Sequence, residues 1–215
     1  MKLDVPLVIQ PKDSLDCGIA STLMLLKYYG KKESLEGLKE GIQVHENGTY
    51  APQIGSFLIR QGFEVTIITM HPKLFTLKDR QLANTQLLER FKTLLASATT
   101  ERDKLVLNYF IKFIDDGGKM IVKIPGIEDI KREIDNGRPV GALMTTNFLN
   151  GAVPKFNFHS NIITGYDDRY IYANDPLWDE RGGKVKYTYE EFLYGLYASA
   201  YGDVDNACLV LIKRR

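Results

Sequence analysis

The sequence predicts an α+β protein in which helices come mainly first and strands mainly last. Apolar residues recur at helical spacing in residues 17–30 and 51–61, and again between residues 72 and 117. After residue 126 the pattern changes to short apolar or alternating runs separated by turn residues, which is typical of strands. This order indicates two halves, with strands concentrated in the second, and it disfavours a wound parallel sheet.

The first predicted helix begins at Cys17. Asp16 is a residue type that favours the N-cap, Gly30 is a type that ends helices, and apolar positions between them repeat every three or four residues. A thiol at a helix N-terminus meets the positive end of the helix dipole, which favours the nucleophilic thiolate. Cys17 is therefore a candidate nucleophile. The alternative is a buried structural cysteine, which is the commoner role of a free cysteine.

Periodicity and turn residues define the other elements. Residues 51–61 predict a helix that Gly62 ends, and the alternation after it predicts a strand at 63–67. Residues 72–117 predict a helical pair, which either packs on the helical half or forms a lid or substrate-binding insert. A short helix is expected at 126–136. Further strands are expected at 140–144, 158–166, 170–174, 184–188 and 207–213, with a helical stretch at 189–194.

The composition disfavours several classes of function. With 28 basic and 27 acidic residues, the net charge of +1 gives no general attraction to nucleic acid or membranes. No signal peptide or membrane-spanning run is visible, so we expect a cytoplasmic protein. Two cysteines far apart do not form a disulfide framework. No zinc motif or phosphate-binding glycine loop occurs, so we expect neither a metal nor a cofactor.

Possible partners for a Cys17 nucleophile lie upstream and far downstream. The side-chain amide of Gln10 could join the Cys17 N–H in an oxyanion hole. His159, at the start of a predicted strand, is a candidate general base. The two other histidines, His45 and His71, stand in turn-like or proline-bounded contexts, where a structural or surface role is commoner.

The pairing of two predicted strands decides which side chain orients His159. If residues 167–169 form a three-residue turn, Asn161 lies opposite Asp175, and His159 and Asp175 become diagonal neighbours on one face. A two-residue turn would shift the register by one and bring Asn174 to that face instead. Either side chain could accept the imidazole N–H and fix its tautomer, so both are candidates.

Taken together, these residues resemble a known family, the bacteriocin-processing (double-glycine leader) peptidase-like group of papain-like cysteine peptidases. The resemblance covers residues 9–70 and 125–212. The motifs that carry it are Gln10, Asp16-Cys17-Gly18, Tyr28-Tyr29-Gly30, His159 with Thr164-Gly165-Tyr166, and Asn174-Asp175-Pro176. The separation of 142 residues between Cys17 and His159 is also characteristic of papain-like enzymes.

The resemblance implies both a fold and a set of residue roles. The implied fold is a single papain-like domain over residues 1–215, with the active site between a helical half and an antiparallel β half. The helical half would cover about 9–125, with a helical insert at about 72–117, and the β half about 126–215. The implied roles are Cys17 as nucleophile, His159 as general base, Asp175 as the residue that orients it, and Gln10 as oxyanion donor. In familiar members the glutamine precedes the cysteine by six residues, and here by seven.

The implied activity is hydrolysis of peptide bonds in a peptide or protein substrate through an acyl-enzyme. If an amine replaced water, the same site would be a transpeptidase. A non-catalytic peptide-binding domain on the same fold is an alternative, because family members with incomplete sites are known. A redox protein is disfavoured because Cys17 has no second cysteine nearby, and Cys208 is expected inside a strand. Trp178 and the loop 181–183 could border the cleft.

Overall fold

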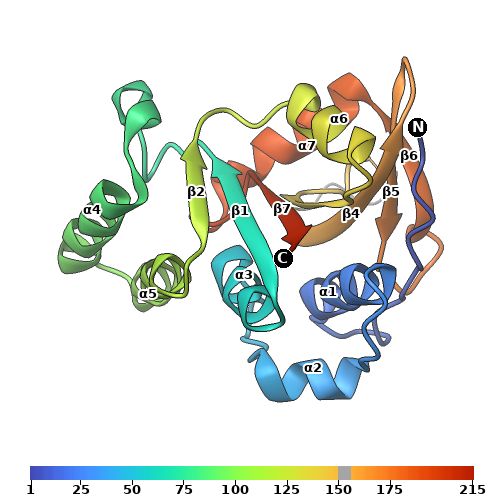
Figure 1. Ribbon diagram of the computed structural model, residues 1–215, viewed down its shortest axis with the longest axis horizontal. Coiled ribbons are helices and arrows are strands. Elements are labelled where there is room, and N and C mark those ends of the chain that lie inside the picture. The colour runs from blue at the N-terminus through green and yellow to red at the C-terminus, as the bar shows by residue number, and fades with distance from the viewer. Residues whose placement is uncertain (150–155) are drawn as a thin grey trace.

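A computed structural model of the protein describes residues 1–149 and 156–215. The strands form one sheet in the order β2-β1-β7-β3-β4-β5-β6 (Figure 1). Their bounds are β1 Phe63–Thr69, β2 Lys119–Val122, β3 Val140–Met144, β4 His159–Tyr166, β5 Tyr170–Asp175, β6 Gly183–Thr188 and β7 Cys208–Arg214. Neighbouring strands run antiparallel except β1 and β2, which run parallel. The predicted α+β class is confirmed.

Helices occur between the strands and before them. They are α1 Cys17–Tyr28, α2 Leu35–Gly41, α3 Ala51–Arg60, α4 Asn84–Ser97, α5 Glu101–Asp115, α6 Ile127–Asp135 and α7 Tyr189–Ala198, with short 3-10 helices η1 Leu77–Gln81 and η2 Ser199–Tyr201. The sequence patterns predicted neither α2 nor β2, both of which are short. In the described part of the chain, no helix combines the length and apolar character needed to cross a bilayer.

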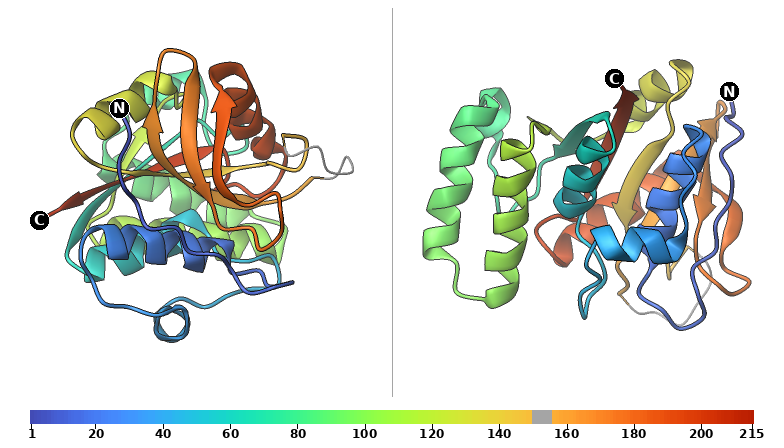
Figure 2. Two further views of the ribbon diagram at one scale, coloured as in Figure 1. Left: turned by 90° about the vertical axis from the view of Figure 1, so that its right-hand side faces the viewer. Right: turned by 60° about the horizontal axis from the view of Figure 1, so that its bottom comes forward.

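The sheet has helices on both faces, as Figures 1 and 2 show. Alternation along β7 explains this arrangement, because successive strand residues point to opposite faces. Cys208, Val210 and Ile212 belong to the core beneath α1 and α3, whereas Leu209 and Leu211 belong to the core beneath α6 and α7. The central strands are therefore buried on both sides.

Two strands from the first half of the chain take part in this sheet. β1 pairs antiparallel along its whole length with β7, the last strand, from Phe63 opposite Arg214 to Thr69 opposite Cys208. β2 then adds to the outer edge of β1. The predicted strand at 63–67 is thus confirmed, and the sheet is not confined to residues 126–215.

The predicted helical pair in residues 72–117 is present as α4 and α5. It lies at the β2 end of the sheet (Figure 2). The rings of Phe91 and Phe110 stack with their centroids 4.9 Å apart, and both side chains are fully buried. Phe113 of α5 packs on α3 so closely that a Cβ on Gly55 would lie 2.6 Å from its ring. The pair is therefore continuous with the main core, in agreement with the packing alternative.

Candidate active site

Cys17 is the first residue of α1, as predicted, and it is partly exposed. Asp16 occupies the N-cap position, but its side chain does not cap the helix. Its carboxylate instead pairs with Lys39 Nζ at 2.6 Å, which ties the start of α1 to α2. Gly18 approaches Thr49 so closely that a Cβ would lie 2.0 Å from Thr49 Oγ1, so a larger residue would displace the helix start.

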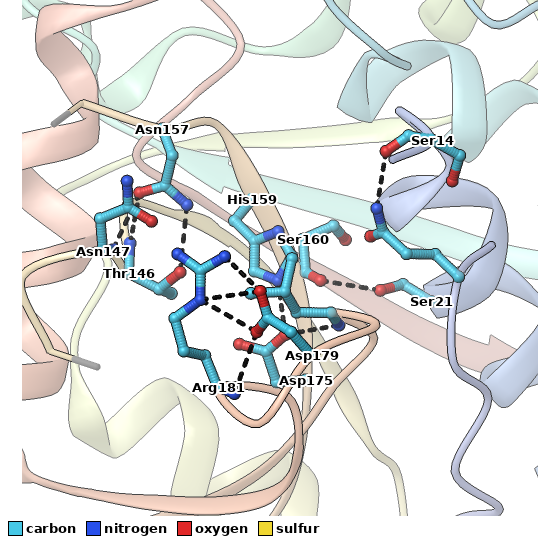
Figure 3. A network of polar contacts seen from close by, with 12 residues as sticks. Ser14, Ser21, Thr146, Asn147, Asn157, His159, Ser160, Asp175, Asp179 and Arg181 are labelled. Atoms are coloured by element: carbon cyan, nitrogen blue, oxygen red, sulfur yellow. Dashed lines mark hydrogen bonds and ion pairs between the residues drawn. The ribbon is translucent and has the colours of Figure 1, made fainter. Parts of the chain in front are cut away.

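The packing of α1 on β4 brings the two ends of the chain together. Ser21 Oγ of α1 donates a hydrogen bond of 2.9 Å to the backbone oxygen of Ser160 in β4 (Figure 3). Because Ser160 is buried and directly follows His159, this contact fixes the start of β4 relative to the start of α1. Cys17 and His159 consequently line the same cleft.

The register of β4 against β5 is the predicted one, but it arises differently. The turn holds two residues between Asp167 and Tyr170, which are joined by an Asp167 N to Tyr170 O hydrogen bond of 3.0 Å. A β-bulge between Ile163 and Gly165 then shifts the register back by one, so that Ile162 lies opposite Asn174. The prediction of a three-residue turn was therefore wrong. A two-residue turn followed by the bulge produces the same pairing of His159 and Asp175 that the three-residue turn would have given.

His159 and Asp175 meet directly as a result of this register. His159 Nε2 donates a hydrogen bond of 2.6 Å to Asp175 Oδ1 (Figure 3). His159 is 5% exposed and Asp175 0%. Asp175 Oδ1 also accepts from Leu177 N at 2.9 Å, which holds the carboxylate in place. Asn174 points to the opposite face, where its Nδ2 donates to Val5 O at 2.9 Å.

The electrostatics of this pair favour a charged histidine. Burial alone would lower the pKa of His159, but the charge of Asp175 and the hydrogen bond with Asp175, with a smaller contribution from nearby Cys17, outweigh it. Together they raise the pKa of His159 from 6.5 to about 10. At neutral pH the ring is therefore an imidazolium beside the Cys17 sulfur, and such a partner stabilises a thiolate.

Gln10 lies at the same cleft in spite of its longer spacing from Cys17. Its backbone N–H donates to Pro176 O at 2.8 Å, which ties it to the loop that follows Asp175. Its Nε2 donates to Ser14 O at 2.7 Å and so keeps a second N–H for another acceptor. The loop between Gln10 and Cys17 turns at Asp13, which adopts the left-handed conformation with φ 57°.

The cleft has a volume of about 330 Å³. Its lining comes from the loop before α1, the turn before α3, the start of β4 and the loop after β5, with Gln10, Leu15, Cys17, Asn47, Phe156, Phe158, His159, Leu177 and Arg181 among the residues. A narrower pocket of about 20 Å³ adjoins it and shares Cys17 and His159. The narrow pocket is walled by Tyr50, Leu143, Phe158, Asp203 and Asp205, among others.

One residue that shapes the cleft was not predicted. Asn157 Oδ1 accepts hydrogen bonds from Thr145 Oγ1 at 2.8 Å, Thr146 N at 2.9 Å and Asn147 N at 3.0 Å (Figure 3). This side chain therefore ties the residues that follow β3 to the residues that lead into β4 and His159. A lone asparagine before a strand carries no sequence signal of such a role.

The loop after Asp175 borders the cleft as expected, because Leu177 and Arg181 line it. Arg181 forms a bidentate ion pair with Asp179 (Figure 3), and this pair lowers the pKa of the Asp179 carboxyl. Trp178 has a different contact, since Lys12 Nζ lies 5.4 Å from its ring centroid. Lys12 lies in the loop that also contains Gln10, so this loop contacts the loop that follows Asp175.

The remaining histidines and the second cysteine have structural surroundings. His45 Nε2 bonds the Tyr109 hydroxyl at 2.8 Å. His71 is fully buried, and its Nδ1 accepts from Lys73 N at 3.2 Å. Cys208 is 0% exposed at the start of β7, so its predicted place inside a strand is confirmed.

Comparison with solved structures shows that the fold is that of papain-like C39 peptidases. One match is a double glycine motif protease from an AMS/PCAT transporter, solved with the leader peptide. This match covers 100% of the present chain and 94% of the protease chain, with a TM-score of 0.53 and 18% identity. The match to a putative C39-like peptidase from Bacillus anthracis covers 100% of the present chain and 98% of the peptidase chain, with a TM-score of 0.56 and 16% identity. The peptidase domain of Streptococcus ComA, a bifunctional ABC transporter, covers 97% and 98%, with a TM-score of 0.52 and 17% identity.

Sequence comparison gives the family. The peptidase C39 family model matches residues 5–88, and the peptidase C39-like family model matches residues 90–203. Because the second match spans more than half of the chain, the protein belongs to the peptidase C39-like family. A curated relative, the uncharacterized protein YvpB of Bacillus subtilis (strain 168), is 34% identical over 62 residues. That match spans 23% of this chain and 25% of the relative.

Proposed function

We propose that the protein is a cysteine peptidase with Cys17 as nucleophile, His159 as general base and acid, and Asp175 as the residue that orients His159. The observation that carries this proposal is the buried His159–Asp175 hydrogen bond of 2.6 Å at the edge of the cleft that contains the first residue of α1. A helix N-terminus, an imidazolium and an orienting carboxylate form the arrangement that activates a thiol.

The proposed reaction begins when the Cys17 thiolate attacks the carbonyl carbon of a peptide bond. The Cys17 backbone N–H and the second N–H of Gln10 Nε2 hold the oxygen that becomes negative. His159 then donates its proton to the leaving amine, and an acyl-enzyme remains. His159 next removes a proton from water, whose oxygen attacks the acyl carbon; the C–S bond then breaks, which releases the acid product and restores the Cys17 thiolate beside the protonated His159. An amine in place of water would give transpeptidation.

The comparisons support a peptide substrate, because one structural neighbour was solved with a leader peptide and the names of all three describe a protease, a putative peptidase or a peptidase domain. The double-glycine specificity named for one neighbour is not transferred to this chain. We further propose that residues 1–215 form one peptidase domain with α4 and α5 as an insert. The cytoplasmic location stays a prediction from the sequence.

A peptide library tests the proposal without knowledge of the natural substrate. The wild-type protein is incubated with proteome-derived peptides, and new peptide termini are identified by mass spectrometry. Termini that appear with the wild type and are absent with Cys17→Ala and His159→Ala would support a peptidase. Peptides that bind the wild type but are never cut would favour the non-catalytic peptide-binding domain instead.

A further inference from the structure

Arg102 connects the helical pair α4–α5 to the wall of the cleft. It lies in the first turn of α5, and its guanidinium forms a bidentate ion pair with Asp203 through Nε and Nη2. The same guanidinium lies over the ring of Phe158, with its central carbon 5.1 Å from the ring centroid. Arg102 therefore contacts two segments that are far apart in the sequence.

Both partners of Arg102 line the space beside Cys17. Phe158 directly precedes His159 and lines both the cleft and the narrow pocket, and Asp203 lines the narrow pocket. The ring of Phe158 also packs on Gly202, where a Cβ would lie 2.3 Å from ring atom Cε1. Arg102 thus holds the Phe158 ring and the segment around Asp203 together at the point where substrate side chains would enter.

The segment that follows η2 is fixed at a second point. Asp205 Oδ2 accepts a hydrogen bond of 2.7 Å from Ala51 N, at the N-terminus of α3. Asp203 and Asp205 are both buried, at 8% and 2% exposure. One wall of the narrow pocket is therefore anchored to α3 by Asp205 and to α5 by Arg102. Loss of Arg102 would free the end of this wall that lies against Phe158.

Among the described residues, the other ion pairs of the helical pair join residues that line neither the cleft nor the narrow pocket. Lys104 pairs with Glu101 at 2.7 Å and Lys92 pairs with Glu89 at 2.8 Å, each one turn away on the same helix. Such exposed pairs contribute little to stability. Arg102 differs because its two partners, Phe158 and Asp203, line the cleft or the narrow pocket.

We propose that Arg102 is a positioning residue that sets the width of the cleft beside Cys17, so that the helical pair determines which substrate side chains fit next to the scissile bond. This inference rests on the proposed function. It assigns a role to the segment 72–117 beyond packing, because Arg102 acts on the cleft through Phe158 and Asp203.

Alkylation of Cys17 measures the width of the cleft without a substrate. The rates with small iodoacetamide and bulky N-(1-pyrenyl)iodoacetamide, which carry the same reactive group, are measured at pH 9, where an ordinary thiol is also ionised. Labelled peptides are assigned by mass spectrometry. The ratio of bulky to small rates cancels changes in thiol reactivity, so it reports access alone. Arg102→Met should raise this ratio roughly two- to fivefold, the factor that loss of a cation–π contact represents.

Matched variants separate positioning from simple destabilisation. Lys104→Met, on the same helix, should leave the ratio unchanged. Arg102→Lys keeps the charge but loses the planar fork, so it should give an intermediate ratio, and it carries the test if Arg102→Met does not fold. Equal ratios for the Arg102 variants and Lys104→Met would overturn the inference, whatever their melting temperatures. Failure of the proposed function would be seen separately, as loss of preferential Cys17 labelling in the wild type at pH 6.

Discussion

Substitution of Asp175 by alanine removes the carboxylate that holds His159. Asp175 Oδ1 accepts hydrogen bonds from His159 Nε2 at 2.6 Å and from Leu177 N at 2.9 Å, and the residue is fully buried. Without it, the imidazole loses the partner that fixes its tautomer. We expect Asp175→Ala to lower turnover by roughly 10²–10⁴-fold. Because Leu177 N–H and His159 then lose their buried acceptor, we expect the free energy of unfolding to fall by about 1–3 kcal/mol.

The same substitution should change the pH dependence of stability. The pKa of His159 is raised from 6.5 to about 10 in the folded state, where the charge of Asp175 helps to overcome the effect of burial. The pair therefore contributes stability that is fully present below about pH 6.5 and is lost as the pH rises to about 10. The difference in unfolding free energy between wild type and Asp175→Ala should be largest below pH 6.5 and shrink toward pH 10.

Asn174→Ala provides the matched control, because Asn174 lies on the same strand, is 2% exposed and donates one hydrogen bond to Val5 O. We expect it to cost about 1 kcal/mol of stability and to leave turnover unchanged. Turnover is measured with a peptide found by the library digest, and stability by urea denaturation from pH 5 to 10. If Asn174→Ala were as damaging as His159→Ala while Asp175→Ala was silent, the assignment of Asp175 would be refuted.

Three further substitutions test other parts of the site. Gln10→Ala should lower turnover roughly 10²–10³-fold by loss of an oxyanion donor, leave thiol labelling unchanged, and cost about 1 kcal/mol of stability through loss of the hydrogen bond to Ser14 O; near-normal turnover would remove Gln10 from the site. Burial raises the pKa of Asp205 from 3.8 to about 7, so its stabilising contribution is present below pH 3.8 and lost by pH 7. Asp205→Asn should therefore show a flatter dependence of unfolding free energy on pH between these values, and an unchanged slope would contradict this reasoning. Ser21→Ala should cost about 1 kcal/mol in urea denaturation through loss of the hydrogen bond to Ser160 O, and no loss would show that the docking of α1 on β4 does not depend on it.

The long elements could be predicted because their signals are local. The start of α1 at Cys17 is marked by Asp16, and its end by Gly30, which adopts φ 77°. Gly62 likewise ends α3, with φ 93°. Apolar alternation located β1 because one face of that strand meets a core. Such signals do not depend on the rest of the fold.

Features set by tertiary contacts could not be predicted in the same way. The bulge between Ile163 and Gly165 lies beside the N-terminal segment, where a Cβ on Gly165 would lie 2.5 Å from Met1 O. Asp16 is a residue type that favours the helix N-cap, yet its side chain pairs with Lys39 of α2, a helix that the sequence did not predict. Arg102 carries no motif, and its contacts with Phe158 and Asp203 exist only after the chain has folded.

Selective labelling of Cys17 tests the central claim most directly. At pH 6 an ordinary thiol is almost fully protonated, and burial raises the pKa of the Cys208 thiol well above its usual range. Limiting iodoacetamide at pH 6 should modify Cys17 roughly tenfold or more faster than it modifies glutathione, and should spare Cys208. His159→Ala should slow this labelling strongly at pH 6 and much less at pH 9. Equal and slow labelling of both cysteines at pH 6, or no effect of losing His159, would contradict the existence of an activated pair.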